Sequence, residues 1–203
     1  MNRCDPAARQ RAGLRFSRIE PDSRRLVAAL DVLAPEERSR AGRFQRESDR
    51  IEYIMARAAL RRLLGRKLGR HPADLVFGSG PAGKPVLLGP EADLHFSLSH
   101  CRGGLLIAWC AGREVGVDLE WMDPARITLG IARRVFSPSQ VRRLELASDT
   151  ERTRLFYRYW TRLEATAKAT GVGVARFRLR PDGLKVGSFS PAPGYIGAVA
   201  VTV

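Results

Sequence analysis

The order of apolar and polar residues predicts regular elements along most of the first half of the chain. From 48 to 68 the apolar side chains recur at helical spacing, which predicts a long amphipathic helix that Ser48 or Asp49 could cap. Shorter helices are expected at 23–33 and from Pro35 onward. Apolar runs bounded by turn residues predict strands at 13–19, 94–99, 104–110 and 114–120.

The second half of the chain carries clearer helix boundaries. Ser137 can cap a helix that has proline at its first position and Gln140 at the capping-box position. A long helix is expected to begin at Asp149 or Thr150 and to end at Gly171, where glycine fits a left-handed stop. Further strands are expected at 177–180, 183–189 and 195–203.

These elements favour an α+β fold built from two similar halves. Each half reads as strands plus one long helix, and no regular alternation of strand and crossover helix is present. The chain has 203 residues, enough for one domain or for two small halves packed together. We therefore predict an N-terminal half at 1–112, a C-terminal half at 113–203 and an internal pseudo-repeat.

Composition places the chain among proteins with a packed apolar core. Its hydrophobic content is 44%. The chain has no run of about 18 apolar residues, so no membrane span is expected. The basic N-terminal segment is not followed by an apolar stretch, so no secretory signal is expected. Cys4, Cys101 and Cys110 lack the spacing of a zinc site, and reduced thiols in a cytoplasmic protein account for them most simply.

The formal net charge of +14 is large for a chain of this length. Such a charge suits a polyanionic partner: a nucleic acid, an acidic protein or a phosphorylated small molecule. Arginines scattered over solvent-exposed faces, without any polyanionic partner, would give the same net charge. Nucleic acid is disfavoured, because aromatic residues make up only 7% of the chain and no stacking platform interleaves the arginines.

Two segments carry the candidate chemistry. Asp118 and Glu120 are two apart in a predicted strand and so point to the same side. Trp160, Glu164 and Lys168 are four apart in a predicted helix and form one stripe. Three converging carboxylates beside a lysine suit a hard divalent cation and the phosphate that it neutralises. Taken singly, these residues could equally be a solvated strand face, an ion pair along a helix and a core tryptophan.

Several short motifs occur together in a recognisable order. They are GKP at 83–85, FSLSH at 96–100, GVDLE at 116–120, FSPSQ at 136–140 and WTRLEATAKATG at 160–171. Their order and spacing resemble those of the 4′-phosphopantetheinyl transferases of the surfactin-synthetase-activating type. The resemblance covers roughly residues 35–171, and the final strand GYIGAVAV is similar as well.

The resemblance implies two similar α+β halves about a pseudo-twofold axis, with coenzyme A in the cleft between them. It implies that Asp118, Glu120 and Glu164 hold Mg²⁺ or Mn²⁺ together with the pyrophosphate of coenzyme A. A serine hydroxyl of an acidic acyl- or peptidyl-carrier protein then attacks the β-phosphate, and 3′,5′-adenosine bisphosphate leaves. Positioning and charge neutralisation carry most of the catalysis in transfers of this kind.

The resemblance also assigns individual roles around the metal. Glu164 is the expected general base, and Lys168 and His100 complete the catalytic candidates. Lys168, Ser99 and His100 are expected to contact the phosphates. Lys84 is expected to reach the adenine or phosphate end of coenzyme A.

Two arginines are looser candidates for the 3′-phosphate, a role that suits a guanidinium. These are Arg40 and Arg57. Glu37 and Glu52 stand at positions where many relatives carry lysine or arginine, which puts this phosphate pocket in question.

A further departure lies inside the catalytic helix, where Leu163 replaces the family's lysine. A phosphate contact is then missing, unless Arg162 or another arginine supplies it. Such a loss typically costs about 1.5–3 kcal/mol, which slows an enzyme without abolishing it. We therefore expect an active, monomeric transferase, with a degenerate member that binds coenzyme A or a carrier protein as the alternative. The sequence leaves the choice of carrier open.

Overall fold

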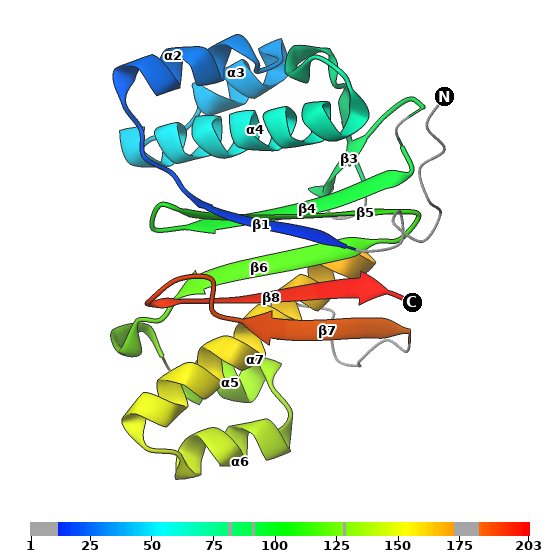
Figure 1. Cartoon of the computed structure of the whole chain (residues 1–203). Helices are drawn as coiled ribbons and strands as arrows, with labels where there is room; N and C mark the ends of the chain where they lie inside the picture. Colours follow the sequence, from blue (N-terminus) through cyan, green and yellow to red (C-terminus); the bar gives the residue numbers. More distant parts are fainter. Residues whose placement is uncertain (1–11, 81–82, 91, 128, 173–182) are drawn as a thin grey trace.

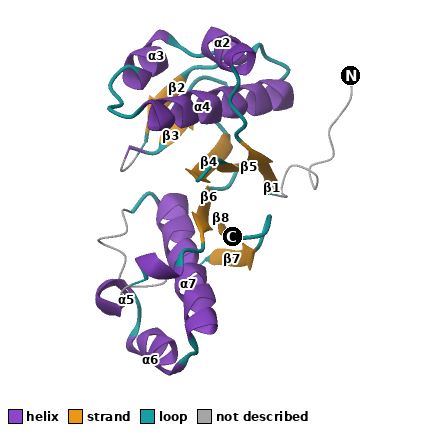
Figure 2. Ribbon diagram, turned by 90° about the vertical axis from the view of Figure 1, so that its left-hand side faces the viewer, coloured by secondary structure: helices purple, strands orange, loops and turns teal. Residues whose placement is uncertain are grey.

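The computed structural model describes residues 12–80, 83–90, 92–127, 129–172 and 183–203. Two sheets stack in the middle of the molecule, and helices cover the outer face of each (Figures 1 and 2). The helices of the first half are α2 (Ser23–Asp31), α3 (Pro35–Ala41) and α4 (Glu47–Leu68). Those of the second half are α5 (Leu129–Val135), α6 (Pro138–Leu146) and α7 (Asp149–Thr170).

Both sheets are antiparallel, and each has three strands. The first has the order β1-β5-β4, from β1 (Gly13–Arg18), β4 (Leu94–Cys101) and β5 (Gly104–Ala111). The second has the order β6-β8-β7, from β6 (Val115–Trp121), β7 (Leu184–Phe189) and β8 (Tyr195–Thr202). A small ribbon pairs β2 (Phe77–Ser79) with β3 (Pro85–Leu87). Single 3₁₀ turns lie at Pro72–Asp74 and Pro124–Arg126.

This architecture confirms the predicted α+β fold of two similar halves. Each half combines a three-stranded antiparallel sheet with one 22-residue helix, α4 or α7. The boundary predicted between residues 112 and 113 falls between β5 and β6 and stays a prediction. The strand predicted at 177–180 lies outside the described residues, whereas those at 183–189 and 195–203 correspond to β7 and β8.

Local helix signals explain most of the helix boundaries. The capping box of α6 is present, because Ser137 Oγ accepts from the Gln140 amide and Gln140 Oε1 accepts from the Ser137 amide. Helix α7 ends at Gly171 with a φ of 69°, as predicted. The predicted cap of α4 is wrong: the helix begins at Glu47, so Ser48 and Asp49 lie inside its first turn.

The two halves meet through the inner faces of their sheets. One buried cluster joins Leu106, Ala108 and Cys110 of β5 to apolar residues of β6 and to Tyr195 of β8. The Tyr195 hydroxyl donates to the Arg102 carbonyl oxygen, 2.7 Å away. This contact holds the turn after β4 against the start of β8, which pairs with the end of β6, and the candidate site lies near this junction. No helix within the described ranges has the length and apolar character needed to cross a bilayer.

Candidate active site

The acidic residues of β6 face the long helix α7. A Cβ on Gly116 would lie 2.0 Å from the Ala165 carbonyl oxygen and 2.4 Å from the Ala169 nitrogen. The helix backbone therefore approaches the strand as closely as only glycine permits. Asp118 and Glu120 follow Gly116 at period two, so they lie on the same side of β6. The sequence prediction that strand and helix bring their functional residues together is consistent with this packing.

Asp118 is the best connected of these residues and is only 5% exposed. Its Oδ1 lies 2.8 Å from Lys168 Nζ and accepts from Ser99 Oγ at 3.0 Å. Its Oδ2 is buried and has no hydrogen-bond partner in the part of the chain that the structure describes. A buried carboxylate oxygen without a donor is costly, which marks this position as fit to receive a ligand.

Glu120 and Glu164 lie close enough to Asp118 for its charge to act on both. Burial, followed by the charge of Asp118, raises the pKa of Glu120 to about 7, although Trp160 Nε1 donates to its Oε1 at 3.2 Å. Burial and the charge of Asp118 also raise the pKa of Glu164, and Lys168 opposes the shift. These three residues, Asp118, Glu120 and Glu164, form the carboxylate cluster. The cluster thus carries more negative charge than the neighbouring positive charges compensate.

A complete metal site is not preformed among the described residues, since no three Asp, Glu, His or Cys side chains are grouped to hold an ion. The convergence of Asp118, Glu120 and Glu164 on one cation therefore stays a prediction. Their chemistry fits a hard cation, because all three are carboxylates and the Asp118 Oδ2 atom has no donor. The Lys168 ammonium supplies part of the missing positive charge.

Ser99 and His100 are neighbours on β4 but face opposite ways. Ser99 points at Asp118, whereas His100 Nδ1 lies 3.4 Å from Glu52 Oε1 on α4. The same Glu52 oxygen accepts from the Gly103 amide at 3.3 Å. Glu52 thus holds both His100 and the β4–β5 turn, which gives this unexpected acid a positioning role.

Lys84 directly precedes β3, and its side chain reaches the start of β6, where it is already paired. Its Nζ contacts Glu114 Oε2 at 2.7 Å and donates to the Val115 carbonyl oxygen at 2.9 Å. The other oxygen of Glu114 lies 3.0 Å from His95 Nδ1. The expectation that Lys84 reaches coenzyme A stays untested, and the contacts present tie β3, β4 and β6 together.

Arg57 points into the core of the first half rather than outward. Its guanidinium pairs with Glu37 Oε1, and Arg61 Nε donates to Glu37 Oε2 at 2.6 Å. Arg57 is 8% exposed, Arg61 1% and Glu37 8%. Glu37 therefore compensates two buried arginines and is not a defect in a phosphate pocket. Because its guanidinium is occupied, Arg57 is a poor candidate for the 3′-phosphate.

Arg40 is exposed and remains accessible. Its guanidinium lies over the Tyr53 ring, 5.4 Å from the ring centre. Together with Glu36, Arg43 and Phe44 it lines a hollow of about 560 Å³ beside α3. Because Arg40 is accessible beside this hollow, it is a stronger candidate for the 3′-phosphate than Arg57.

Neither Leu163 nor Arg162 of α7 is placed to make the phosphate contact expected from the family's lysine. Leu163 packs against the apolar cluster that joins α5, α6 and α7. Arg162 Nη1 donates to the Val186 carbonyl oxygen of β7 at 3.0 Å. Arg162 is thus directed toward β7 and not toward the carboxylates, so the expectation that it could supply the phosphate contact is not supported.

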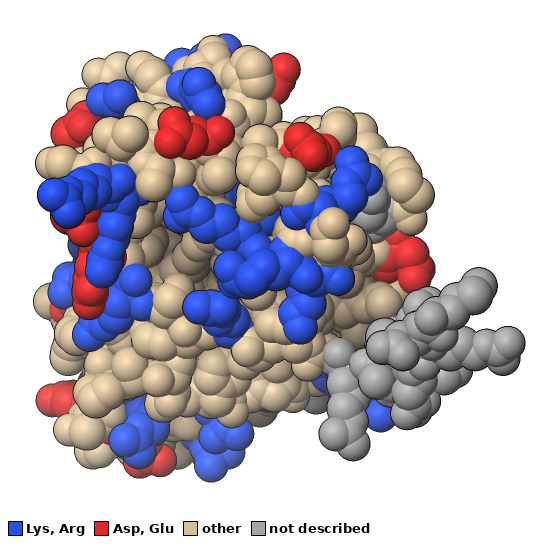
Figure 3. All heavy atoms as spheres, turned by 45° about the horizontal axis from the view of Figure 1, so that its top comes forward, with Lys and Arg blue, Asp and Glu red and all other residues tan. Residues whose placement is uncertain are grey.

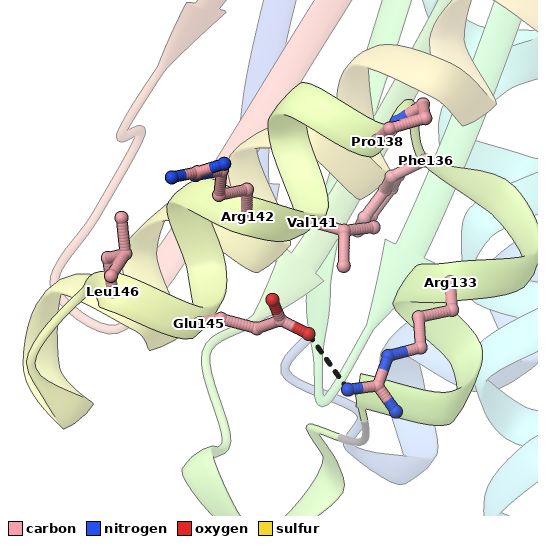
Figure 4. A pocket seen from close by; sticks show the side chains of 7 residues that line it. All are labelled: Arg133, Phe136, Pro138, Val141, Arg142, Glu145 and Leu146. Atoms are coloured by element: carbon pink, nitrogen blue, oxygen red, sulfur yellow. Dashed lines mark hydrogen bonds and ion pairs between the residues drawn. The ribbon is translucent and has the colours of Figure 1, made fainter.

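A separate groove of about 580 Å³ lies between α5 and α6 and is crossed by an ion pair of 2.8 Å between Arg133 and Glu145 (Figure 4). It is lined by Arg133, Phe136, Pro138, Val141, Arg142, Glu145 and Leu146. None of these residues belongs to the carboxylate cluster, so this groove is not the site of the predicted chemistry.

Sequence reasoning missed three positioning contacts around the site. These are the Trp160–Glu120 hydrogen bond, the Glu114 bridge to Lys84 and the Glu52 contact with His100. The stripe shared by Trp160 and Glu164 was the only signal for the first. The other two join elements far apart in the chain and left no local pattern.

Comparisons with known proteins bear on both halves of the molecule. Residues 17–110 match the family model for the 4′-phosphopantetheinyl transferase N-terminal domain, and residues 114–193 match the 4′-phosphopantetheinyl transferase superfamily. The chain is 36% identical to the 4′-phosphopantetheinyl transferase HetI of Nostoc, over 77% of this chain and 67% of HetI. It is 29% identical to the 4′-phosphopantetheinyl transferase Sfp of Bacillus subtilis, over 76% of this chain and 70% of Sfp.

A protein of Synechocystis that carries the same family name is 40% identical over 76% of this chain. The match spans 64% of that relative, slightly under two thirds of its length. The two family models meet where β5 ends and β6 begins, and Asp118, Glu120 and Glu164 all lie within the second. The chain belongs to the 4′-phosphopantetheinyl transferases.

Proposed function

We propose that this chain transfers the 4′-phosphopantetheine arm of coenzyme A to a serine of an acyl- or peptidyl-carrier protein and releases 3′,5′-adenosine bisphosphate. The observation that carries the proposal is the undercompensated acidic cluster around Asp118, whose buried Oδ2 receives no hydrogen bond from the described residues. The cluster lies between α7 and the contact of the two sheets, and Lys168 stands beside it.

The proposed metal ligands are Asp118, Glu120 and Glu164, which would hold Mg²⁺ or Mn²⁺. When bound, such a cation neutralises the pyrophosphate and the charge that develops on the leaving side. The raised pKa values of Glu120 and Glu164 support this role, because a nearby cation would offset both the burial and the repulsion from Asp118 that raise them.

Glu164 is the proposed general base. Its carboxylate is half-buried on α7, one helical turn from Lys168, and would be held where the serine hydroxyl donates its proton. It takes the proton from the serine hydroxyl as the serine oxygen bonds to the β-phosphorus of coenzyme A. The bond between that phosphorus and the bridging oxygen breaks, and the electron pair leaves with the adenosine bisphosphate.

The remaining groups are proposed to bind and orient coenzyme A. Lys168, one helical turn from Glu164, would exchange its contact with Asp118 for the phosphates. Ser99 and His100 would hydrogen-bond phosphate oxygens on either side of the end of β4. Lys84 would support the nucleotide end, and the exposed Arg40 suits the 3′-phosphate better than the paired Arg57.

The expected second substrate is an acidic carrier protein. A chain with a net charge of +14 attracts an acidic partner and speeds their encounter. A monomer in the cytoplasm fits this role, since both halves lie in one chain and Cys101 and Cys110 form no disulfide among the described residues.

One observation favours the alternative of a degenerate member that binds without efficient transfer. The lysine expected before Glu164 is Leu163, and Arg162 is directed to β7 instead. The loss of one charge-assisted contact, about 1.5–3 kcal/mol, predicts slower transfer but not its absence.

The decisive experiment mixes the protein with an apo-carrier protein, coenzyme A and Mg²⁺ and follows the carrier by mass spectrometry. We expect the mass gain of one phosphopantetheine arm, its loss in Asp118→Asn and Glu164→Gln, and its retention in the control Glu145→Gln on α6. No mass gain in the wild-type protein, with coenzyme A binding unchanged by Asp118→Asn, would refute the enzymatic proposal and favour the binding-only alternative.

A further inference from the structure

A second groove lies on the first half, away from the carboxylate cluster. We call it the β1 groove; its volume is about 480 Å³. It is lined by Leu14 and Arg15 of β1, Leu63, Arg66 and Lys67 of α4, and Trp109 of β5. None of these residues has a part in the proposed transfer reaction.

The groove has an apolar floor that depends on a missing side chain. A Cβ on Gly13 would lie 2.1 Å from two ring carbons of Trp109, so only glycine lets the indole lie across the β1 backbone. Leu14 is 41% exposed and extends this apolar surface around the strand. An apolar floor beside a strand suits a side chain of a bound polypeptide.

The rim of the groove is entirely basic. Arg15, Arg66 and Lys67 have no carboxylate at ion-pair distance among the described residues, although Lys67 Nζ stacks 4.8 Å from the Trp109 ring centre. Basic side chains gather across the middle of the face that carries α4 and β1 (Figure 3). Uncompensated cations of this kind attract a negatively charged partner.

The groove runs along a sheet edge. Strand β1 pairs with β5 on one side, and no described strand pairs with its other side. An open edge presents unpaired backbone groups to an added strand. Charged residues alone can blunt such an edge, but blunting does not require the apolar floor made by Gly13 and Trp109.

We propose that the β1 groove binds an extended acidic segment of a partner protein. Its carboxylates pair with Arg15, Arg66 and Lys67, an apolar side chain covers Trp109 and Leu14, and its backbone adds to the free edge of β1. A second copy of this chain is a poor occupant, because both copies carry a net charge of +14. Single-stranded nucleic acid fits less well, since the groove offers one indole that Lys67 already covers.

The test uses a fluorescein-labelled peptide of alternating glutamate and valine, a matched peptide with glutamine for glutamate, and an oligothymidylate. Anisotropy at low salt gives the affinity of the full chain for each probe. The Arg15→Glu/Arg66→Glu variant is compared with Arg142→Glu/Arg143→Glu on α6, which makes the same change of net charge at exposed positions of the other half.

We expect the glutamate peptide to bind at least about tenfold more tightly than the glutamine peptide. Binding should fall at least about tenfold in Arg15→Glu/Arg66→Glu and less than about twofold in the α6 control. Hydrogen exchange of the wild-type amides at 14–18 should slow when the peptide is bound. Equal losses in both variants, unchanged exchange in β1, or binding of the oligothymidylate in place of the peptide would each overturn the proposal.

Discussion

Removing the charge of Glu37 should destabilise the first half of the molecule far more than a single surface substitution does. In Glu37→Gln the side chain keeps its length and can still accept from the Ala34 amide, which it now does at 3.0 Å. The helix cap of α3 is therefore preserved. What is lost is the carboxylate between the guanidiniums of Arg57 and Arg61, which are 8% and 1% exposed.

The two arginines differ in what they retain after this change. Arg61 still donates to three carbonyl oxygens, those of Pro72, Ala73 and Leu75. Arg57 has no such hydrogen bonds to other described residues and retains its stacking on the Phe77 ring, 4.7 Å from the ring centre. Breaking a buried ion pair from one side costs about 3–5 kcal/mol. For a chain of this length that corresponds to a decrease in Tm of about 6–20 °C.

The free energy of unfolding in urea measures the effect, and the exposed neighbour provides the control. Glu36→Gln removes the same charge from the same helix, and we expect it to change stability by less than about 0.5 kcal/mol. A difference below about 1 kcal/mol between Glu37→Gln and Glu36→Gln would refute the reasoning.

The difference in unfolding free energy between wild type and Glu37→Gln should also depend on pH. Burial would raise the pKa of Glu37, but Arg57, Arg61 and the Ala34 amide outweigh it and hold the pKa below its ordinary value of 4.5. The contribution of Glu37 is therefore present above pH 4.5 and is lost as the pH falls through the lower folded-state pKa. The difference in unfolding free energy between wild type and Glu37→Gln should therefore begin to decrease as the pH falls below 4.5.

Three further predictions concern the carboxylate cluster. Because the pKa of Glu120 is raised from 4.5 to about 7, the metal-free fold loses stability as the pH rises from about 4.5 to 7, and the loss is complete above pH 7. Glu120→Gln should thus raise Tm at pH 8 in EDTA and change it much less at pH 5. Lys168→Met should lower kcat/KM for transfer about 10- to 100-fold, measured against coenzyme A concentration, and an unchanged value would exclude a phosphate contact. Gly116→Ala should cost about 1–3 kcal/mol in urea unfolding, because its Cβ would collide with Ala165, whereas Gly130→Ala, which has open space, should cost less.

Local sequence patterns predicted the elements well because each depends on residues close in the chain. The capping box at Ser137 and the glycine stop at Gly171 are read within one helical turn. The predicted start of α4 was wrong. Ser48 and Asp49 are both suitable cap residues, but the helix begins at Glu47, one residue before Ser48, and has no side-chain cap. Two plausible caps in a row leave the boundary ambiguous.

The hydrophobic pattern of α4 does not reveal that two of its arginines are buried. Arginines on an amphipathic helix are expected in water, but Arg57 and Arg61 lie on its buried side. Their burial becomes possible because Glu37, at least 20 residues away in the chain, compensates both charges. A pattern of hydrophobicity within one helix carries no information about such a partner.

The sequence by itself determined the α+β elements, the order of the motifs and therefore the family. It also placed Asp118 and Glu120 on one face, because the period of a strand is local and nearly invariant. Only the tertiary structure decided which charges meet: Lys168 and Ser99 at Asp118, and Glu37 with the arginines of α4. Charge pairs form between elements distant in the chain, and their strength depends on burial, which exists only once the elements have packed.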